Sequence, residues 1–177
     1  FWSVLPDGRF VTAVSDRLGI IIGAQDGTGR VVAGRVEGNR PSAAYLAEEL
    51  EAYEKQYDWY MTYGRGDFGD ERPTIPAVKQ ELSAMIVDVS GRIWIRRTSE
   101  SIRIELPPKE PNPLLIPDVP YIERARYLGF STDGAFLGEL ELPPGLGIDS
   151  FSKDHVWVFR RTPDGDLLVS RYRIPWE

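Results

Sequence analysis

Five short turn signals divide this sequence and constrain its fold more than any other feature. Each places a glycine after an aspartate or a serine, between runs of apolar, β-branched or aromatic residues. Glycine readily adopts the positive φ angles that tight hairpin turns require, and Asp-Gly is a strong hairpin signal. The chain is therefore expected to be mostly antiparallel sheet. The five turns are Pro6-Asp7-Gly8-Arg9, Gln25-Asp26-Gly27-Thr28, Val89-Ser90-Gly91-Arg92, Thr132-Asp133-Gly134 and Pro163-Asp164-Gly165-Asp166.

The strands predicted around these turns fall into groups and indicate a mainly β fold. We expect strands at residues 1–5, 9–14, 18–24, 30–36, 83–88, 92–98, 123–131, 135–141, 147–151, 155–161 and 167–174. A recurring unit of four strands, with a turn inside each half, is typical of a propeller blade. The pattern predicts about three antiparallel propeller-like blades in one domain over 1–177: a blade at 1–38, a second at 76–142 and a partial blade, short of one strand, at 145–177.

Two insertions interrupt these groups. The first, residues 39–72, contains a predicted helix at roughly 42–60, because Ser42 can cap its N-terminus and apolar and aromatic residues follow on one face. Those residues are Leu46, Leu50, Tyr53, Tyr57 and Tyr60. The second insertion, residues 100–120, is rich in proline from roughly 106 to 120. Proline cannot donate to a sheet, so this segment is predicted to be an extended arm or loop.

Charge and composition exclude several kinds of partner and site. The chain has 21 basic and 27 acidic residues, a net charge of −6, which disfavours nucleic acid and anionic membranes because both require a clustered positive field. Cysteine is absent, which excludes disulfides and thiolate metal sites. The longest apolar run, residues 18–24, is far shorter than the roughly 20 residues of a membrane span. The start at Phe1 rather than Met is consistent with a processed chain.

Several segments carry a family likeness, namely Pro76-Ala77-Val78-Lys79, residues 85–95 and 130–138, and Leu142-Pro143-Pro144-Gly145, with residues 1–9 before them. In this order they resemble the C-terminal half of bacterial six-bladed β-propeller proteins of the NHL-like and TolB-like kind. The resemblance covers most of the chain. It implies a ring of sheets around an axis and a periplasmic, extracellular or cell-envelope location.

Only about half of a six-bladed ring is present, and three blades cannot close on themselves. Three explanations stay open. The upstream half lies outside this sequence, a partner covers the two open blade faces, or the sheets form a sandwich-like arrangement. The partial blade also leaves an unpaired strand edge, which folded proteins normally cover or blunt.

No residue is predicted to be catalytic or to bind a cofactor or metal. His155 is the only histidine, and no Gly-x-Ser-x-Gly elbow presents a nucleophile to it, so we interpret it as a turn or edge residue. The turn aspartates are expected to bond their own turn backbone rather than calcium. We interpret Asp88 as a hairpin staple with Trp94 in the core between sheets. The turn aspartates are Asp7, Asp26, Asp88, Asp133 and Asp164.

The best candidates for a partner interface are aromatic and proline residues in the two insertions. The aromatic residues around the helix exceed what one helix face can bury, and such residues are enriched in interface hot spots. The alternative is that they hold the helix on its own sheet. The candidates are Tyr57, Trp59, Tyr60, Tyr63, Phe68, Pro107, Pro108, Pro111 and Pro113.

Arginines near the strand ends form a second group. Because side chains alternate along a strand, those of this group are expected to point to solvent. There they either bind an acidic partner or form ion pairs with the aspartates and glutamates that are in excess in this chain. They are Arg96, Arg97, Arg124, Arg126, Arg160, Arg161, Arg171 and Arg173.

These features predict a non-enzymatic, extracytoplasmic accessory subunit that binds a protein partner, such as a subunit of a membrane complex, without spanning the membrane itself. The alternative is a propeller hydrolase, lactonase or sugar-binding protein with an axial metal site. The scarcity of asparagine, with only Asn39 and Asn112, argues against the lactonase type.

Overall fold

The computed structural model describes residues 1–14, 19–23, 28–33, 43–63, 74–108, 110, 112, 114–162 and 166–174. These residues are mainly β, which confirms the predicted fold class at that level. The described residues form three antiparallel sheets and one two-stranded hairpin. The first sheet has the order β1-β2-β3-β4 and consists of β1 (Trp2–Val4), β2 (Phe10–Val14), β3 (Gly19–Gly23) and β4 (Gly29–Ala33).

The central and third sheets follow in the chain, and within the described residues no sheet closes on itself. The central sheet has the order β10-β9-β6-β5 and consists of β5 (Leu82–Val87), β6 (Ile93–Arg97), β9 (Arg126–Phe130) and β10 (Phe136–Glu141). The third sheet has the order β11-β12-β13 and consists of β11 (Gly147–Phe151), β12 (His155–Arg161) and β13 (Leu167–Arg173).

A hairpin that the sequence did not indicate flanks the proline-rich segment, which was predicted at roughly 106–120 as an extended arm or loop. Strand β7 (Ser101–Arg103) precedes this segment and pairs antiparallel with β8 (Tyr121–Glu123), which follows it. The proline-rich segment between them contains no strand among its described residues. The three-residue strands are too short for an alternating pattern to reveal them, which explains why the sequence did not indicate this hairpin.

Three hairpin turns share one hydrogen-bonding pattern, as the glycine spacing predicted. In each, the amide of the first residue donates to the carbonyl of the fifth, and the glycine amide donates to the carbonyl of the first. These turns span residues 5–9, 88–92 and 131–135. Their glycines, Gly8, Gly91 and Gly134, have φ between 80° and 86°. The other two predicted turns, 25–28 and 163–166, lie mostly outside the described residues.

Comparing alanine substitutions at Gly91 and Gly145 separates the cost of a left-handed backbone from the cost of a steric clash. Their φ angles are +80° and +79°, but a Cβ on Gly91 would lie 2.5 Å from Cγ2 of Thr132, whereas one on Gly145 would meet nothing within 4 Å. Left-handed backbone costs alanine about 1–2 kcal/mol. We expect Gly145→Ala to lower the free energy of unfolding by about 1 kcal/mol and Gly91→Ala by about 2–3 kcal/mol, measured by urea denaturation. Equal losses would show that the contact with Thr132 is unimportant.

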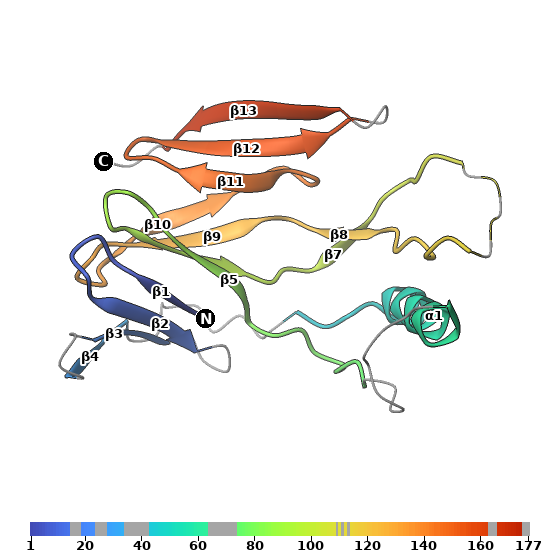
Figure 1. Cartoon of the computed structure of the whole chain (residues 1–177), viewed down its shortest axis with the longest axis horizontal. Helices are drawn as coiled ribbons and strands as arrows, with labels where there is room; N and C mark the ends of the chain where they lie inside the picture. The colour runs from blue at the N-terminus through green and yellow to red at the C-terminus, as the bar shows by residue number, and fades with distance from the viewer. Residues whose placement is uncertain are drawn as a thin grey trace.

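The three sheets are stacked as layers, with the central sheet between the other two (Figure 1). Alternate residues of β6 face the first sheet and the third sheet, since Ile93 and Ile95 lie in one apolar cluster and Trp94 lies in the other. The cluster against the first sheet consists of Leu5, Val11, Ala13, Ile20, Ile22, Leu82, Ile93, Ile95, Leu128 and Phe130. The cluster against the third sheet consists of Trp94, Ala125, Tyr127, Leu142, Phe151, Val156, Val158 and Ile174.

Asp88 and Trp94 connect a turn of the central sheet to the third sheet, as the sequence predicted. The buried Asp88 carboxylate accepts hydrogen bonds from Trp94 Nε1 (3.1 Å) and Arg92 Nε (2.8 Å), and from the amides of Ser90 and Arg92. Trp94 stacks on Phe151 of β11, with ring centroids 4.1 Å apart. The staple therefore fixes both the turn and the contact between two sheets.

The helix α1 (Ala47–Tyr63) begins and ends a few residues later than predicted. Ser42 and Gly64, the expected cap and stop, lie outside the described residues. Glu49 in the first turn accepts a hydrogen bond from the amide of Leu46 (3.3 Å), which is one half of a capping box. Glu49 is the one helix residue that is fully buried, so a charged side chain, and not an apolar face, anchors this helix.

Candidate functional site

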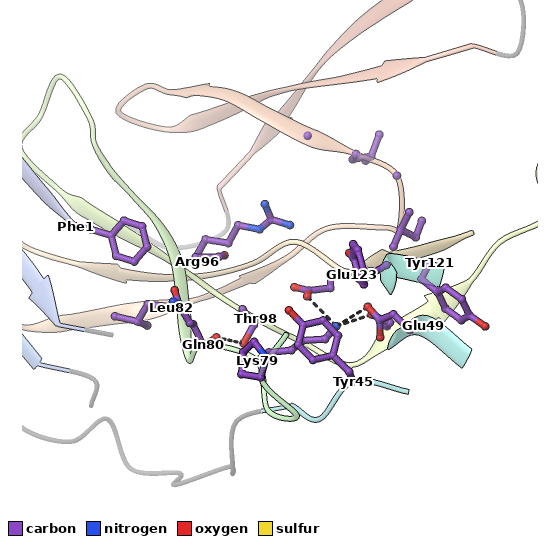
Figure 2. A pocket seen from close by; sticks show the side chains of 18 residues that line it. Phe1, Tyr45, Glu49, Lys79, Gln80, Leu82, Arg96, Thr98, Tyr121 and Glu123 are labelled. Carbon is purple, nitrogen blue, oxygen red and sulfur yellow. Dashed lines mark hydrogen bonds and ion pairs between the residues drawn. The ribbon is translucent and has the colours of Figure 1, made fainter. Parts of the chain in front are cut away.

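A pocket of about 690 Å³ lies where α1, the β7–β8 hairpin and the central sheet meet (Figure 2). The starts of three strands also border it, because Phe1 precedes β1, Leu82 begins β5 and Gly147 begins β11. The first strand of each of the three sheets, β1, β5 and β11, therefore begins beside this pocket. The remaining polar lining comes chiefly from Glu49, Lys79, Arg96, Thr98, Ser101 and Glu123.

One wall of the pocket is a buried ion-pair network around Lys79, whose side chain is only 2% exposed. Its Nζ lies 2.9 Å from Oε1 of Glu123 and 3.2 Å from Oε1 of Glu49. It also donates to Oγ of Ser101 (2.5 Å), and that hydroxyl donates to Glu49 (2.6 Å). The ring of Tyr45 covers the ammonium, with its centroid 4.9 Å away. The network joins α1, β7 and β8 to the segment before β5.

The charges of this network keep Lys79 protonated. Burial alone would lower the pKa of Lys79, but the hydrogen bonds and charges of Glu123 and Glu49 outweigh that effect and hold the pKa above its ordinary value. A serine–lysine nucleophile pair needs a neutral lysine to take the proton from the hydroxyl. Lys79 is protonated at neutral pH, so it cannot activate Ser101 in this way.

His155 lies at a strand start, and two of the five turn aspartates, Asp7 and Asp88, bond their own turn backbone as the sequence predicted. His155 begins β12, and its Nδ1 lies 2.7 Å from Oδ1 of Asp154, a hydrogen bond that lowers the pKa of that carboxyl. Asp7 accepts from the amide of Arg9 (3.1 Å), as a turn aspartate does. In the turn containing Asp133, Ser131 Oγ accepts the turn amides instead. Asp26 and Asp164 lie outside the described residues.

The described residues were also compared with the requirements of a metal site and of a membrane-spanning helix. Among the described residues, no group of three or more histidine, aspartate or glutamate side chains is arranged to hold a metal ion. The one described helix is not long and apolar enough to cross a membrane.

The predicted interface residues of the helix lie near its C-terminal end and are partly exposed. Tyr57, Trp59 and Tyr60 are half-buried and Tyr63 is exposed. Trp59 contacts both Tyr60 and Tyr63, with ring centroids 5.4 and 5.8 Å apart. Pro107 and Pro108 are exposed on the arm. Phe68, Pro111 and Pro113 lie outside the described residues, so the candidates are not all placed.

The outer faces of the first and third sheets carry large exposed apolar side chains, and we call these the two outer faces. Register places Trp2, Val4, Phe10 and Ile21 together on the first sheet, opposite the side that packs on the central sheet. On the third sheet, Trp157, Phe159, Leu167 and Val169 share the outward side. Trp2 is 74% exposed, and every residue of the edge strand β13 is exposed. Monomeric proteins rarely leave such contiguous apolar faces uncovered.

Three of the eight arginines singled out from the sequence form ion pairs with acidic residues of this chain. Arg97 pairs with Glu81 (3.0 Å), and Arg124 and Arg126 both pair with Glu141 (2.9 and 2.8 Å). These three arginines therefore meet the acidic excess of the chain itself, although the side chain of Arg97 is only 17% exposed. Arg96 differs, because it lines the pocket and not a solvent-facing sheet surface.

Sequence reasoning missed both Lys79 and Arg96 as pocket residues. Lys79 follows an apolar, proline-containing segment and carries no local signal of burial. Its partners Glu49 and Glu123 lie 30 and 44 residues away in the chain, so only the tertiary fold brings them together. Arg96 was assigned to a solvent face by alternation, and alternation cannot show that the same face lies over a pocket at the strand end.

Comparison with protein-family models, curated proteins and solved structures finds no match to this chain. The likeness to NHL-like and TolB-like propellers therefore remains a prediction from the quoted motifs.

Proposed function

We propose that this chain is a non-enzymatic protein-interaction module, built from propeller-like sheets, that binds a protein partner through its two outer faces. The observation that carries the proposal is the pair of exposed apolar faces at opposite ends of the sheet stack. An extracytoplasmic accessory role in a larger complex is the setting that the propeller resemblance suggests.

The occupant proposed for each outer face is a β-sheet of the partner that presents branched aliphatic and aromatic side chains. The two internal interfaces of this chain support this choice, because each packs one sheet face on another through residues of the same kind. The outer faces continue the same stack and also present branched aliphatic and aromatic side chains, although the third sheet adds Arg171 over the ring of Trp157. An added sheet at either end would bury their side chains as the internal interfaces do, at about 25 cal/mol per Å² of apolar area.

The edge of the third sheet supports the same proposal. Strand β13 pairs with β12 on one side, and the described residues supply no further strand on the other. Leu167, Leu168, Val169 and Tyr172 are all exposed on it. An apolar, unpaired edge strand readily accepts another strand. A partner strand added here would complete a four-stranded sheet like the other two.

Serine substitutions on the outer faces test the proposal. The isolated chain is expected to self-associate and to bind a hydrophobic dye, because the faces meant for the partner are free. Phe10→Ser with Phe159→Ser should reduce both effects severalfold, measured by light scattering and dye fluorescence. Val89→Ser is the matched control, since Val89 is 80% exposed but lies alone in a turn. Equal behaviour of the double variant and the control would contradict the proposal.

A further inference from the structure

Arg96 has no partner among the described residues that accounts for its charge. Its Nε is buried and donates no hydrogen bond. No described carboxylate forms an ion pair with it, whereas its neighbour Arg97 is paired with Glu81. In Figure 2 the side chain of Arg96 stands apart from the dashed contacts of Lys79. A buried donor without an acceptor is rare and costly in folded proteins, so it calls for a ligand or another explanation.

The backbone places Arg96 at the edge of the pocket for a clear reason. It lies near the end of β6, opposite Tyr127 in register and on the same side of the sheet as Trp94. Deeper in the sheet, that side is filled by the Trp94–Phe151 stack. At the strand end only Gly147 of β11 and the two residues before it, Gly145 and Leu146, line the pocket on that side together with Arg96.

The charged side chains of the pocket indicate which kind of ligand it would bind, namely an anion with a single charge. Its charged side chains are two cations, Lys79 and Arg96, and two carboxylates, Glu49 and Glu123. Lys79 contacts both carboxylates, at 2.9 and 3.2 Å, so these three side chains together carry a net charge of −1. Among the charged side chains of the described lining, Arg96 is the one with no ion-pair partner, and a single negative charge on a ligand would match it. A dianion would bring a second charge with no cation to meet it.

The volume of the pocket and its uncharged lining residues indicate the size and polarity of the rest of the ligand. A volume of about 690 Å³ falls within the range of small-molecule sites. Aromatic and aliphatic side chains line it beside the polar ones, and they favour an apolar body. They include Phe1, Tyr45, Tyr53, Leu82, Tyr121 and Leu146.

We propose that this pocket binds a small monocarboxylate with an apolar or aromatic body, and that Arg96 receives its carboxylate. A guanidinium forms two parallel hydrogen bonds with a carboxylate, which an ammonium cannot reproduce. The Lys79 network then serves as the rigid wall that holds α1 and the β7–β8 hairpin around the ligand. This inference is separate from the outer faces and does not depend on them.

The experiment titrates the 177-residue chain with phenylacetate as the probe, up to about 10 mM, and follows binding by ligand-observed NMR. Phenylacetamide is the neutral probe of the same shape, and phenyl phosphate is the dianionic probe. Phenylacetate is expected to bind saturably. The other two are expected to bind at least about tenfold more weakly.

Substitutions at two neighbouring positions supply the controls. Arg96→Met should weaken phenylacetate binding at least about tenfold, while Arg97→Met should leave it unchanged because Arg97 does not line the pocket. Arg96→Lys should restore only part of the affinity. Circular dichroism confirms that each variant is folded, and if Arg96→Met fails to fold, the three probes on the unaltered chain still decide.

Several results would overturn the proposal. One is the absence of saturable phenylacetate binding by the unaltered chain, and another is unchanged affinity in a folded Arg96→Met variant. Equal binding of phenylacetamide would show that charge is not recognised. Tighter binding of phenyl phosphate would show that the site prefers a dianion.

Discussion

Replacing Lys79 with methionine is expected to lower the free energy of unfolding by about 3–5 kcal/mol. The substitution leaves two carboxylates, Glu49 and Glu123, without the cation that lies within 3.2 Å of both. The cost of an uncompensated buried charge exceeds what the added apolar surface of methionine contributes. Urea denaturation followed by circular dichroism measures the difference.

Two comparisons decide whether burial is the cause. Lys55→Met removes an ion pair of similar length, 2.8 Å to Glu51, but both side chains are more than 60% exposed, so its effect on stability should be far smaller than that of Lys79→Met. Combining Lys79→Met with Glu49→Gln and Glu123→Gln removes all three charges and should recover much of the loss. A small loss in Lys79→Met itself would mean that the network is not anchoring the helix.

The pH dependence of this difference has a definite sign. Because the folded chain holds the pKa of Lys79 above the ordinary value of 10.5, the folded state keeps the proton more tightly than the unfolded state. The stabilisation is therefore complete below that value and is lost as the pH rises through the folded pKa. The stability gap between the unaltered chain and Lys79→Met should stay constant from neutral pH upward and narrow only in strong alkali.

Replacing Trp94 with alanine is expected to cost about 3–5 kcal/mol of unfolding free energy. Trp94 is fully buried, stacks on Phe151 at 4.1 Å and donates to Asp88. Its removal opens a cavity between the central and third sheets and leaves the Asp88 carboxylate with one donor fewer. Thermal unfolding followed in the near-ultraviolet should show the loss.

A phenylalanine at this position separates the two contributions. Trp94→Phe keeps an aromatic ring against Phe151 but cannot donate to Asp88, so it should cost clearly less than alanine, about 1–3 kcal/mol. If the two variants lose the same stability, the stacking contact contributes little and the account of how these sheets are joined is wrong.

The sheets of this fold were predictable because their signals are local. Asp-Gly turns and alternating apolar residues lie within ten residues of one another, so the strands on either side of residues 88–92 and 131–135 follow from the sequence. The β7–β8 hairpin escaped prediction because its strands have three residues each and are joined by a long proline-rich segment. The helix boundaries shifted because burial of Glu49 against Lys79 helps to define its first turn.

The pocket could not be predicted, since it depends on contacts between distant segments. Alternation assigns Arg96 to one side of β6, but only the position of β11 shows that this side borders a space at one end and a packed core at the other. Lys79 looks like an ordinary surface residue until α1 and β8 bring their carboxylates to it. Ion pairs between residues far apart in the chain produce no periodic pattern in the sequence, so sequence analysis does not detect them.

The central claim is that the outer faces require cover from another polypeptide. Sedimentation velocity of the isolated chain over a hundredfold range of concentration tests it most directly. The account predicts a mass that rises above 20.0 kDa as concentration increases, because uncovered faces bind one another. A constant monomer mass, together with cooperative unfolding, would contradict it.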